Sequence, residues 1–228
     1  MDIIIDIDGT NTRIAKTIAQ DEFASPVIFE TPQSFDEWFN LAVGHVDNLR
    51  KNERIGTIVV GMAGTFKNNN GTIHVSPHLP LWNDIPLKEK LGSWFNCEAV
   101  LLNDTALVGL GEAVYGAGKG NEIVVYITIS TGVGGVRIVD GKIDRNRRGF
   151  EIGHEIVNEG KELEYYLAGS SHEKRFGIPS KDIKDESFWK EVNYYTGILG
   201  ANTCMYWSPD CIIFGGPVMN DINLEEVE

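Results

Sequence analysis

The chain has 228 residues, of which 42% are hydrophobic, enough to bury the core of one large or two small domains. Its 33 acidic and 20 basic residues give a net charge of −13, and no Lys/Arg cluster offsets this charge, so the composition argues against nucleic-acid binding. The sequence has no leader-like opening and no run of about 20 apolar residues that could span a membrane, so we expect a cytoplasmic protein without a membrane partner.

Apolar runs alternate with helical patterns along the chain, as in an α/β protein. Five runs of β-branched or aliphatic residues, each bounded by Gly, Asn or Asp, predict buried strands at residues 2–8, 55–62, 98–102, 122–130 and 211–215. Ser34 and Glu37 form a capping box before an apolar stripe that ends near Leu49, which predicts a helix. A second stripe with helical spacing contains Phe188, Val192, Tyr195 and Leu199.

The first predicted strand runs into "IDIDGTNTR", residues 5–13, which has two incompatible interpretations. An apolar strand followed by Asp-x-Asp-Gly-Thr resembles the opening motif of the haloacid dehalogenase phosphatases. In that family Asp6 would attack phosphorus and Asp8 would handle the proton. The same residues resemble the first phosphate loop of the actin-like sugar kinases, in which the turn only cradles ATP. The local stretch does not decide between the two.

The phosphatase interpretation requires a later acidic pair of the Gly-Asp-x-x-x-Asp type, after another apolar strand, to hold Mg²⁺. The stretch "LLNDTALV" supplies one carboxylate where two are needed, and "SKDIKDE" supplies two but follows no predicted strand. A match as short as the first motif also arises by chance. The phosphatase therefore remains only an alternative.

The opening strand–turn–strand has a counterpart in "VYITISTGVGGVRIV", residues 125–139. Each copy consists of an apolar strand, a small polar turn and an apolar return strand, and the alignment sets residues 6–8 opposite residues 128–130. Backbone N–H groups in such turns can bind oxyanions. The repeat predicts two related α/β lobes, each with a turn of this kind, and a nucleotide held in a cleft between them.

Seven stretches, in order from residue 3 to about residue 219, resemble the ROK (repressor, open reading frame, kinase) sugar kinases of the actin-like ATPase superfamily. They are "IDIDGTNTR", "GMAG" (61–64), "SPHLPLW" (76–82), "LLNDTALVGLGEA" (101–113), "TGVGG" (131–135), "GFEIGH" (149–154) and "IIFGGPV" (212–218). The resemblance implies two ribonuclease-H-like lobes, assigned here to residues 1–112 and 113–228, with a central cleft. It also implies ATP-dependent phosphorylation of a hexose, with the 6-hydroxyl favoured. Family repressors carry a DNA-binding domain ahead of this module, and we expect none here because the sequence opens on the first strand.

The resemblance assigns the catalytic and sugar-binding roles. Asp104 would be the general base, since a carboxylate near a sugar hydroxyl can take its proton as the oxygen approaches phosphorus. It begins a predicted helix, whose dipole is expected to keep it ionised. The residues assigned to the sugar are Asn103, Glu151, His154, Glu164 and His78, the last standing where relatives commonly have Asn.

By the same resemblance, three turns would hold ATP, because glycine lets backbone N–H groups approach phosphate oxygens closely. The assigned residues are Gly9, Thr10 and Asn11 in the first turn, Thr131, Gly132, Gly134 and Gly135 in the second, and Gly215 and Gly216 beside the adenosine. Asp6 would hold Mg²⁺ through water. Asp8 replaces a family glycine, so it is either a second Mg²⁺ contact or a sign of weakened activity.

The sequence departs from the family at a zinc motif and at the carboxyl end. Relatives have a cluster of cysteines after the Glu-x-Gly-His, whose histidine binds zinc, whereas "HEIVNEGKELEYY" contains no cysteine. Cys97, Cys204 and Cys211 lie far apart, so we expect buried free thiols and no zinc. We expect a carboxylate such as Glu155 or Glu164 to orient His154 instead. The family's final strand and closing helix are also not found.

The sequence therefore predicts a ROK-type kinase that binds a hexose and MgATP. A homodimer is one hypothesis for its assembly. Glucose is the first choice of substrate, followed by N-acetylmannosamine, N-acetylglucosamine or another hexose. A second hypothesis from a different class is a sugar-binding pseudokinase or sensor, which would use the same site without turnover.

Overall fold

The computed structural model describes residues 1–19, 22–67, 71–146 and 149–227, and the chain divides into two compact units, Met1–Leu107 and Val108–Glu228. The strands of the first unit are β1 (Ile3–Ile7), β2 (Asn11–Ala19), β3 (Glu22–Phe23), β4 (Val27–Glu30), β5 (Thr57–Met62), β6 (Thr65–Lys67), β7 (Thr72–Val75) and β8 (Glu98–Asn103). Its helices are α1 (Phe35–Arg50), α2 (Leu87–Phe95) and a 3₁₀ turn, Pro80–Trp82. The boundary between the units falls within α3 (Asp104–Val114).

The second unit is built in the same mixed α/β style. Its strands are β9 (Ile123–Ile129), β10 (Val133–Val139), β11 (Lys142–Ile143), β12 (Ile156–Asn158), β13 (Lys161–Glu162) and β14 (Cys211–Gly215). Its helices are α4 (Leu163–Leu167), α5 (Gly169–Phe176) and α6 (Glu186–Trp207), with 3₁₀ turns at Ile152–His154, Ser180–Asp182, Pro217–Asp221 and Leu224–Glu226.

The sheet of the first unit has the strand order β3-β2-β1-β5-β8, with β4 also paired to β2. The strands β1, β5 and β8 are parallel and in register, so that Ile7 lies beside Met62 and Met62 beside Asn103. The three strands therefore end at one edge of the sheet. The segments that follow these strands all begin at that edge. The turn after β1 and the start of α3 therefore lie close together.

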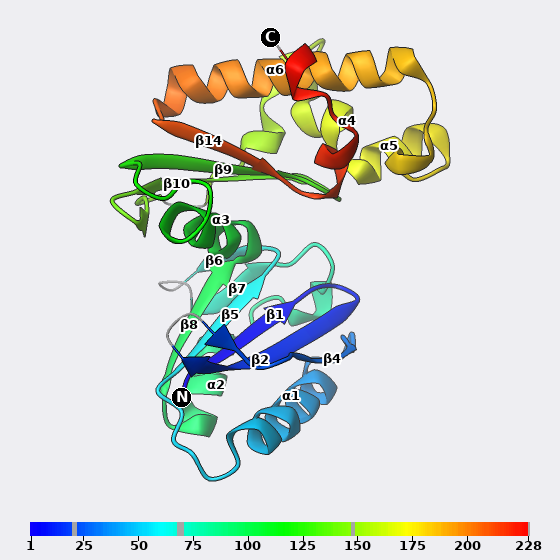
Figure 1. Cartoon of the computed structure of the whole chain (residues 1–228). Coiled ribbons are helices and arrows are strands. Elements are labelled where there is room, and N and C mark those ends of the chain that lie inside the picture. The colour runs from blue at the N-terminus through cyan, green and yellow to red at the C-terminus, as the bar shows by residue number, and fades with distance from the viewer. Residues whose placement is uncertain (20–21, 68–70, 147–148, 228) are drawn as a thin grey trace. The chain divides into compact units, whose positions relative to one another are not determined.

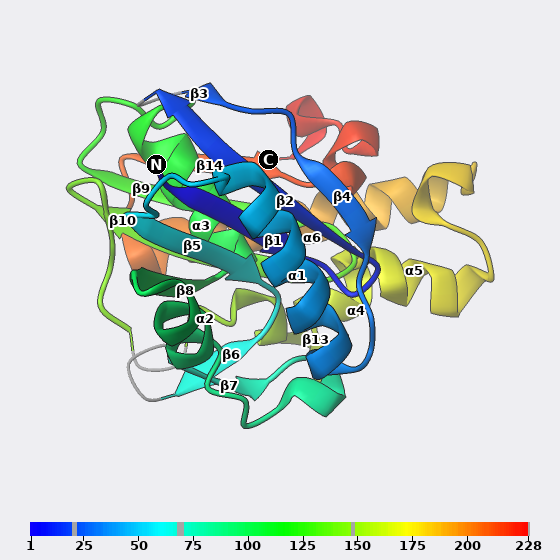
Figure 2. The same cartoon turned by 90° about the horizontal axis from the view of Figure 1, so that it is seen from below.

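Alternating apolar residues of these strands make one buried face, which α1 and α2 cover (Figure 2). Ile3, Ile5 and Ile7 of β1 have almost no exposed surface, and neither has Trp38 of α1. Trp38 also donates a hydrogen bond from Nε1 to the hydroxyl of Thr12 (3.0 Å), which is paired with Thr31 (2.9 Å). Since all three polar groups are buried, this network fixes α1 against the start of β2.

The second unit has a four-stranded sheet in the order β11-β10-β9-β14, and α6 runs across one of its faces (Figure 1). β9 and β14 are parallel, with Thr128 paired to Gly215, so these two strands also end together. Buried residues of α6, among them Phe188, Val192 and Leu199, pack with the apolar residues of β9 in one core.

The five predicted strands and the three predicted helices, α1, α3 and α6, are confirmed. α1 begins after Ser34, whose hydroxyl accepts a hydrogen bond from the N–H of Glu37, as the capping box predicts. The predicted repeat is also confirmed, because β1–β2 and β9–β10 are both antiparallel hairpins with three-residue turns, 8–10 and 130–132. Within the described residues, no helix is both long enough and apolar enough to cross a membrane.

One prediction about the cysteines is wrong. The three thiols are free, as predicted, but Cys204 is exposed and Cys97 and Cys211 are only partly buried. Cys204 lies on α6, whose apolar stripe turns the neighbouring position Thr203 inward instead. A single cysteine in a helix does not itself indicate whether it faces the core or the solvent. The pattern of apolar residues around it determines this.

The buried network around Trp38 yields a stability prediction. Trp38→Phe keeps most of the apolar contact but removes the donor to Thr12, so we expect the free energy of unfolding to fall by about 1–3 kcal/mol in urea denaturation. Trp94→Phe is the matched control, because Trp94 is 60% exposed and its loss should change stability by only about 0.5 kcal/mol. Equal losses in the two variants would contradict the role given to the hydrogen bond.

Candidate functional site

The turn after β1 is packed so closely that only glycine fits at its second position. The N–H of Asp8 donates to the carbonyl of Asn11 (3.0 Å) and closes the turn. A Cβ added to Gly9 would lie 2.5 Å from the Cβ of His78, well inside the contact limit. The backbone of the turn and His78 are therefore in direct contact. This contact explains why the motif has glycine at position 9.

Two carboxylates beside this turn share one cation. Nη1 of Arg13 donates to Oδ2 of Asp6 (2.9 Å) and to Oδ2 of Asp8 (2.8 Å). Burial raises the pKa of Asp6, and the negative charge of Asp8 raises it further, while the bond from Arg13 acts in the opposite direction. Asp6 and Asp8 are thus two oxygen-bearing groups held at the same edge of the sheet.

Asn103 and Asp104 stand where β8 ends and α3 begins. Oδ1 of Asn103 accepts a hydrogen bond from the N–H of Ala106 (3.3 Å), so Asn103 caps the helix, and its amide nitrogen donates to the carbonyl of Gly64 (3.2 Å). Oδ1 of Asp104 accepts from the N–H of Thr105 (2.8 Å).

The pKa of Asp104 lies above the ordinary aspartate value, chiefly because the carboxyl group is buried. The charge of Asp8 adds to this rise, whereas the bond from Thr105 and the charge of His78 oppose it. Burial therefore outweighs the stabilisation that the helix start was expected to give the ionised form. The result is a carboxylate more basic than usual, which suits a proton acceptor.

In the second unit, the turn between β9 and β10 is tied to α4 and α5. The N–H of Ser130 donates to the carbonyl of Gly132 (2.8 Å), and Oε1 of Glu164 accepts from the N–H of Val133 (2.8 Å). At the start of α5, the N–H groups of Gly169 and Ser170 donate to the carbonyls of Ser130 (2.7 Å) and Thr131 (3.1 Å). The turn is thus held in one conformation from both sides, and Glu164 contributes to this support.

A cavity of about 480 Å³ opens beside this turn. Thr131 and Ser170 line one part of it, and Pro217 and Val218, which directly follow the Gly215–Gly216 pair, line another. Gly216 has φ +96°, and a Cβ there would lie 2.3 Å from the carbonyl oxygen of Ile129, so glycine is required where β14 ends against β9. The cavity is large enough for a small organic ligand.

His154 lies between carboxylates on the 3₁₀ turn that follows Glu151. Its Nδ1 is 2.8 Å from Oε2 of Glu162, and its Nε2 is 3.9 Å from Oε2 of Glu151. A carboxylate does orient this ring, as predicted, but it is Glu162 and neither Glu155 nor Glu164, because the β12–β13 hairpin pairs Ile156 with Glu162 and so returns Glu162 to the histidine. The bond to Glu162 is the largest cause of a raised pKa for His154.

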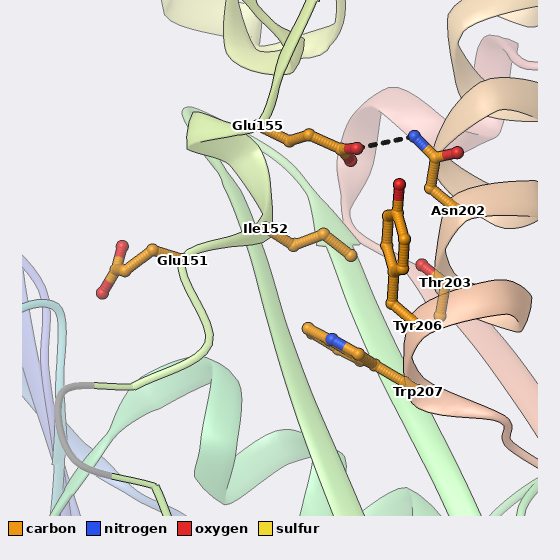
Figure 3. A pocket seen from close by; sticks show the side chains of 7 residues that line it. All are labelled: Glu151, Ile152, Glu155, Asn202, Thr203, Tyr206 and Trp207. Atoms are coloured by element: carbon orange, nitrogen blue, oxygen red, sulfur yellow. Dashed lines mark hydrogen bonds between the residues drawn. The ribbon is translucent and has the colours of Figure 1, made fainter.

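Glu155 points the other way and is held by α6. Its Oε1 accepts a hydrogen bond from the amide of Asn202 (2.7 Å). The two residues, with Tyr206 and Trp207, line a smaller cavity of about 290 Å³, from which the carboxylate of Glu151 points away (Figure 3). The neighbouring residues His154 and Glu155 are therefore fixed by different elements.

The predicted site residues divide into two groups, one in each unit. The first contains Asp6, Asp8, Gly9, Thr10, Asn11, His78, Asn103 and Asp104, and the second Thr131, Gly132, Gly134, Gly135, Glu151, His154, Glu164, Gly215 and Gly216. Sequence reasoning missed Arg13, Glu162 and Asn202. A signal existed for Arg13, since it stands opposite Asp6 in the hairpin that the sequence predicted.

The residues of the first group are suited to bind a Mg²⁺ ion that arrives in complex with a nucleotide. In the part of the chain that the structure describes, no three His, Cys, Asp or Glu side chains gather closely enough to hold a metal by themselves. Mg²⁺ bound with a nucleotide needs only one or two carboxylates, because phosphates and water supply its other ligands. Asp6 and Asp8 provide such carboxylates.

The ROK family model matches residues 3–227, nearly the whole sequence. The chain belongs to the ROK family. Among curated relatives, it is 30% identical over 158 residues to a glucokinase of Streptomyces coelicolor, a match that covers 68% of this chain and 50% of that protein. The chain thus spans about half the length of that relative. It is 35% identical over 212 residues to a glucokinase of Halalkalibacterium halodurans, covering 74% of this chain and 63% of the relative.

Solved structures agree on the fold. The ROK hexokinase of Thermus thermophilus superposes with a TM-score of 0.84 at 23% identity, covering 99% of this chain and 84% of the hexokinase. A ROK glucokinase of Streptomyces griseus, solved with glucose and AMPPNP, gives 0.76 at 22% identity, covering 96% and 84%. The fold is therefore the actin-like ATPase fold of these sugar kinases, as predicted.

The contact between His154 and Glu162 predicts a pH dependence. We expect NMR titration to place the pKa of His154 above its ordinary value of about 6.5 and Glu162→Gln to lower it. Because the folded-state pKa is the higher one, the stabilisation is full below the unfolded pKa and is lost as pH rises through the folded pKa. Glu155→Gln is the control, since Glu155 bonds Asn202 instead. If the pKa of His154 were unchanged in Glu162→Gln, Glu162 would not be the cause of its rise.

Proposed function

We propose that this protein phosphorylates a hexose with ATP, as a ROK-type sugar kinase. The observation that carries the proposal is Asp104, a partly buried carboxylate with a raised pKa at the sheet edge where β1 ends and its glycine turn begins. Such a carboxylate next to a phosphate-binding turn is what transfer of a phosphoryl group to an alcohol requires. Relatives named glucokinase and fructokinase support the substrate class.

Asp104 is proposed as the general base. It takes the proton of the sugar hydroxyl as that oxygen forms its bond to the γ-phosphorus, while the bond to the leaving β-phosphate oxygen breaks and ADP departs. Asn103 and His78 are proposed as sugar ligands. Asn103 is suited to this because the helix cap and the bond to Gly64 hold its amide in one orientation.

The proposed phosphate contacts are the backbone N–H groups of Gly9 and Thr10 in the first turn and of Gly132 in the second, since those of Asp8 and Ser130 close the turns themselves. The adenosine is assigned to the cavity beside Gly215 and Gly216. Asp6 would hold Mg²⁺ through water, with Asp8 as a second contact. When bound, the metal offsets the negative charge of the phosphate oxygens. The remaining proposed residues are Thr131, Gly134 and Gly135 for the nucleotide and Glu151, His154 and Glu164 for the sugar.

Glucose is the first proposed substrate, with N-acetylmannosamine, N-acetylglucosamine and other hexoses behind it. A sensor that binds sugar without turnover is the second candidate, and Asp8 favours it because an added carboxylate opposes nucleotide phosphates. The ion pair with Arg13 weighs against the sensor, since it offsets that charge.

A coupled ADP-release assay with MgATP and a panel of hexoses and N-acetylhexosamines tests the proposal. Asp104→Asn should lower kcat by at least about 10²-fold with little change in sugar binding, because it removes a proton acceptor and keeps the shape. Asp140→Asn, an exposed carboxylate of the second unit, is the control. Binding without turnover would favour the sensor, and phosphate release from sugar phosphates would favour the phosphatase.

We also propose that the protein works without zinc. Cys97 precedes β8, Cys204 lies on α6 and Cys211 begins β14, and a carboxylate oxygen of Glu162 lies 2.8 Å from Nδ1 of His154, so this ring is oriented by a side chain of the protein. We expect no stoichiometric zinc by elemental analysis and full activity after a zinc-selective chelator in excess Mg²⁺. Activity lost to the chelator and restored by zinc would reject this proposal.

A further inference from the structure

One nitrogen of Arg13 joins the two carboxylates of the first turn. Arg13 lies on β2 directly opposite Asp6 on β1, and its Nη1 is 2.9 Å from Asp6 and 2.8 Å from Asp8. The three side chains are 41%, 41% and 46% exposed, so solvent and small ligands can reach them. A single donor between two acceptors sets the position of both carboxylates relative to the turn.

The charges around this turn make such a counterion necessary. Asp104, which follows β8, adds its negative charge to those of Asp6 and Asp8, because β1 and β8 end at the same edge of the sheet. Nucleotide phosphates would bring further negative charge to the same edge of the sheet. At separations of a few ångströms, uncompensated like charges repel strongly where water is partly excluded. Asp8 therefore creates a need for a cation that a turn without this carboxylate would not have.

We propose that Arg13 is a positioning residue for nucleotide binding: it holds Asp6 and Asp8 in the arrangement that accepts the metal–nucleotide complex, and Asp8 makes the protein depend on it. The inference rests on the proposed function, because it concerns the same turn. Without Arg13, Asp6 and Asp8 would repel each other, and Asp8 would present an uncompensated charge to the phosphates.

A purely structural role for Arg13 leads to different expectations. A cross-strand ion pair that only stabilises the hairpin would change the thermal midpoint when removed and leave nucleotide affinity unaltered. It would also give no reason for removal of the Asp8 charge to restore binding. The coupling between Arg13 and Asp8 in nucleotide affinity is thus the quantity that separates the two roles.

The test is a double-mutant cycle on the full chain, with the Kd of ADP measured by calorimetry in excess Mg²⁺ and again in EDTA, and with the thermal midpoint of each apo variant. The variants are Arg13→Met, Arg13→Lys, Asp8→Asn and Arg13→Met/Asp8→Asn. We expect Arg13→Met to weaken ADP binding in Mg²⁺ about tenfold or more, and the double variant to regain most of that loss. Arg13→Lys should retain part of the affinity. Arg50→Met, which removes a guanidinium paired with Asp47 on α1, should bind like the wild type.

Two outcomes would overturn the inference while leaving the kinase proposal intact: Arg13→Met binding ADP like the wild type, or a double variant as weak as Arg13→Met. A fall in thermal midpoint alone would assign Arg13 to hairpin stability and would likewise overturn it. If the wild-type protein bound no nucleotide in Mg²⁺, the kinase proposal itself would fail, and this inference with it.

Discussion

The parallel register of β1, β5 and β8 is the constraint on which the first group of site residues depends. Backbone hydrogen bonds set Ile7 beside Met62 and Met62 beside Asn103, so the chain leaves all three strands at one edge. A slip of one residue would turn every buried isoleucine of β1 outward, and the apolar face therefore locks the register. Packing in the core thus decides where Asp8 and Asp104 lie, although neither belongs to the core.

The second unit also has parallel strands that end at one edge of its sheet, but with different residues there. Thr128 of β9 pairs with Gly215 of β14, which brings the turn 130–132 to the glycines that follow β14. In the first unit the hairpin carries the carboxylates of Asp6 and Asp8 and the guanidinium of Arg13, whereas in the second the turn carries hydroxyls and glycine and is held by α4 and α5. The same hairpin therefore carries charged side chains in one unit and small polar residues that line a cavity in the other.

The sequence was sufficient for the strands, the two long helices, the repeated hairpins and the family, because each rests on a local pattern. It was not sufficient to predict which side chains contact each other. Glu155, Glu162 and Glu164 all lie within ten residues of His154, and only the hairpin register selects Glu162. Likewise, the sequence supplied the helix start at Asp104, but the extent of its burial, which raises its pKa, comes from tertiary packing.

The opposite orientations of His154 and Glu155 tie the 3₁₀ turn at Ile152–His154 to two separate elements. His154 is bonded to β13 and Glu155 to Asn202 on α6, so the peptide between them is held at both ends. One short turn therefore joins the β12–β13 hairpin and the long helix α6 through two adjacent side chains, although α6 begins more than 30 residues further along the chain.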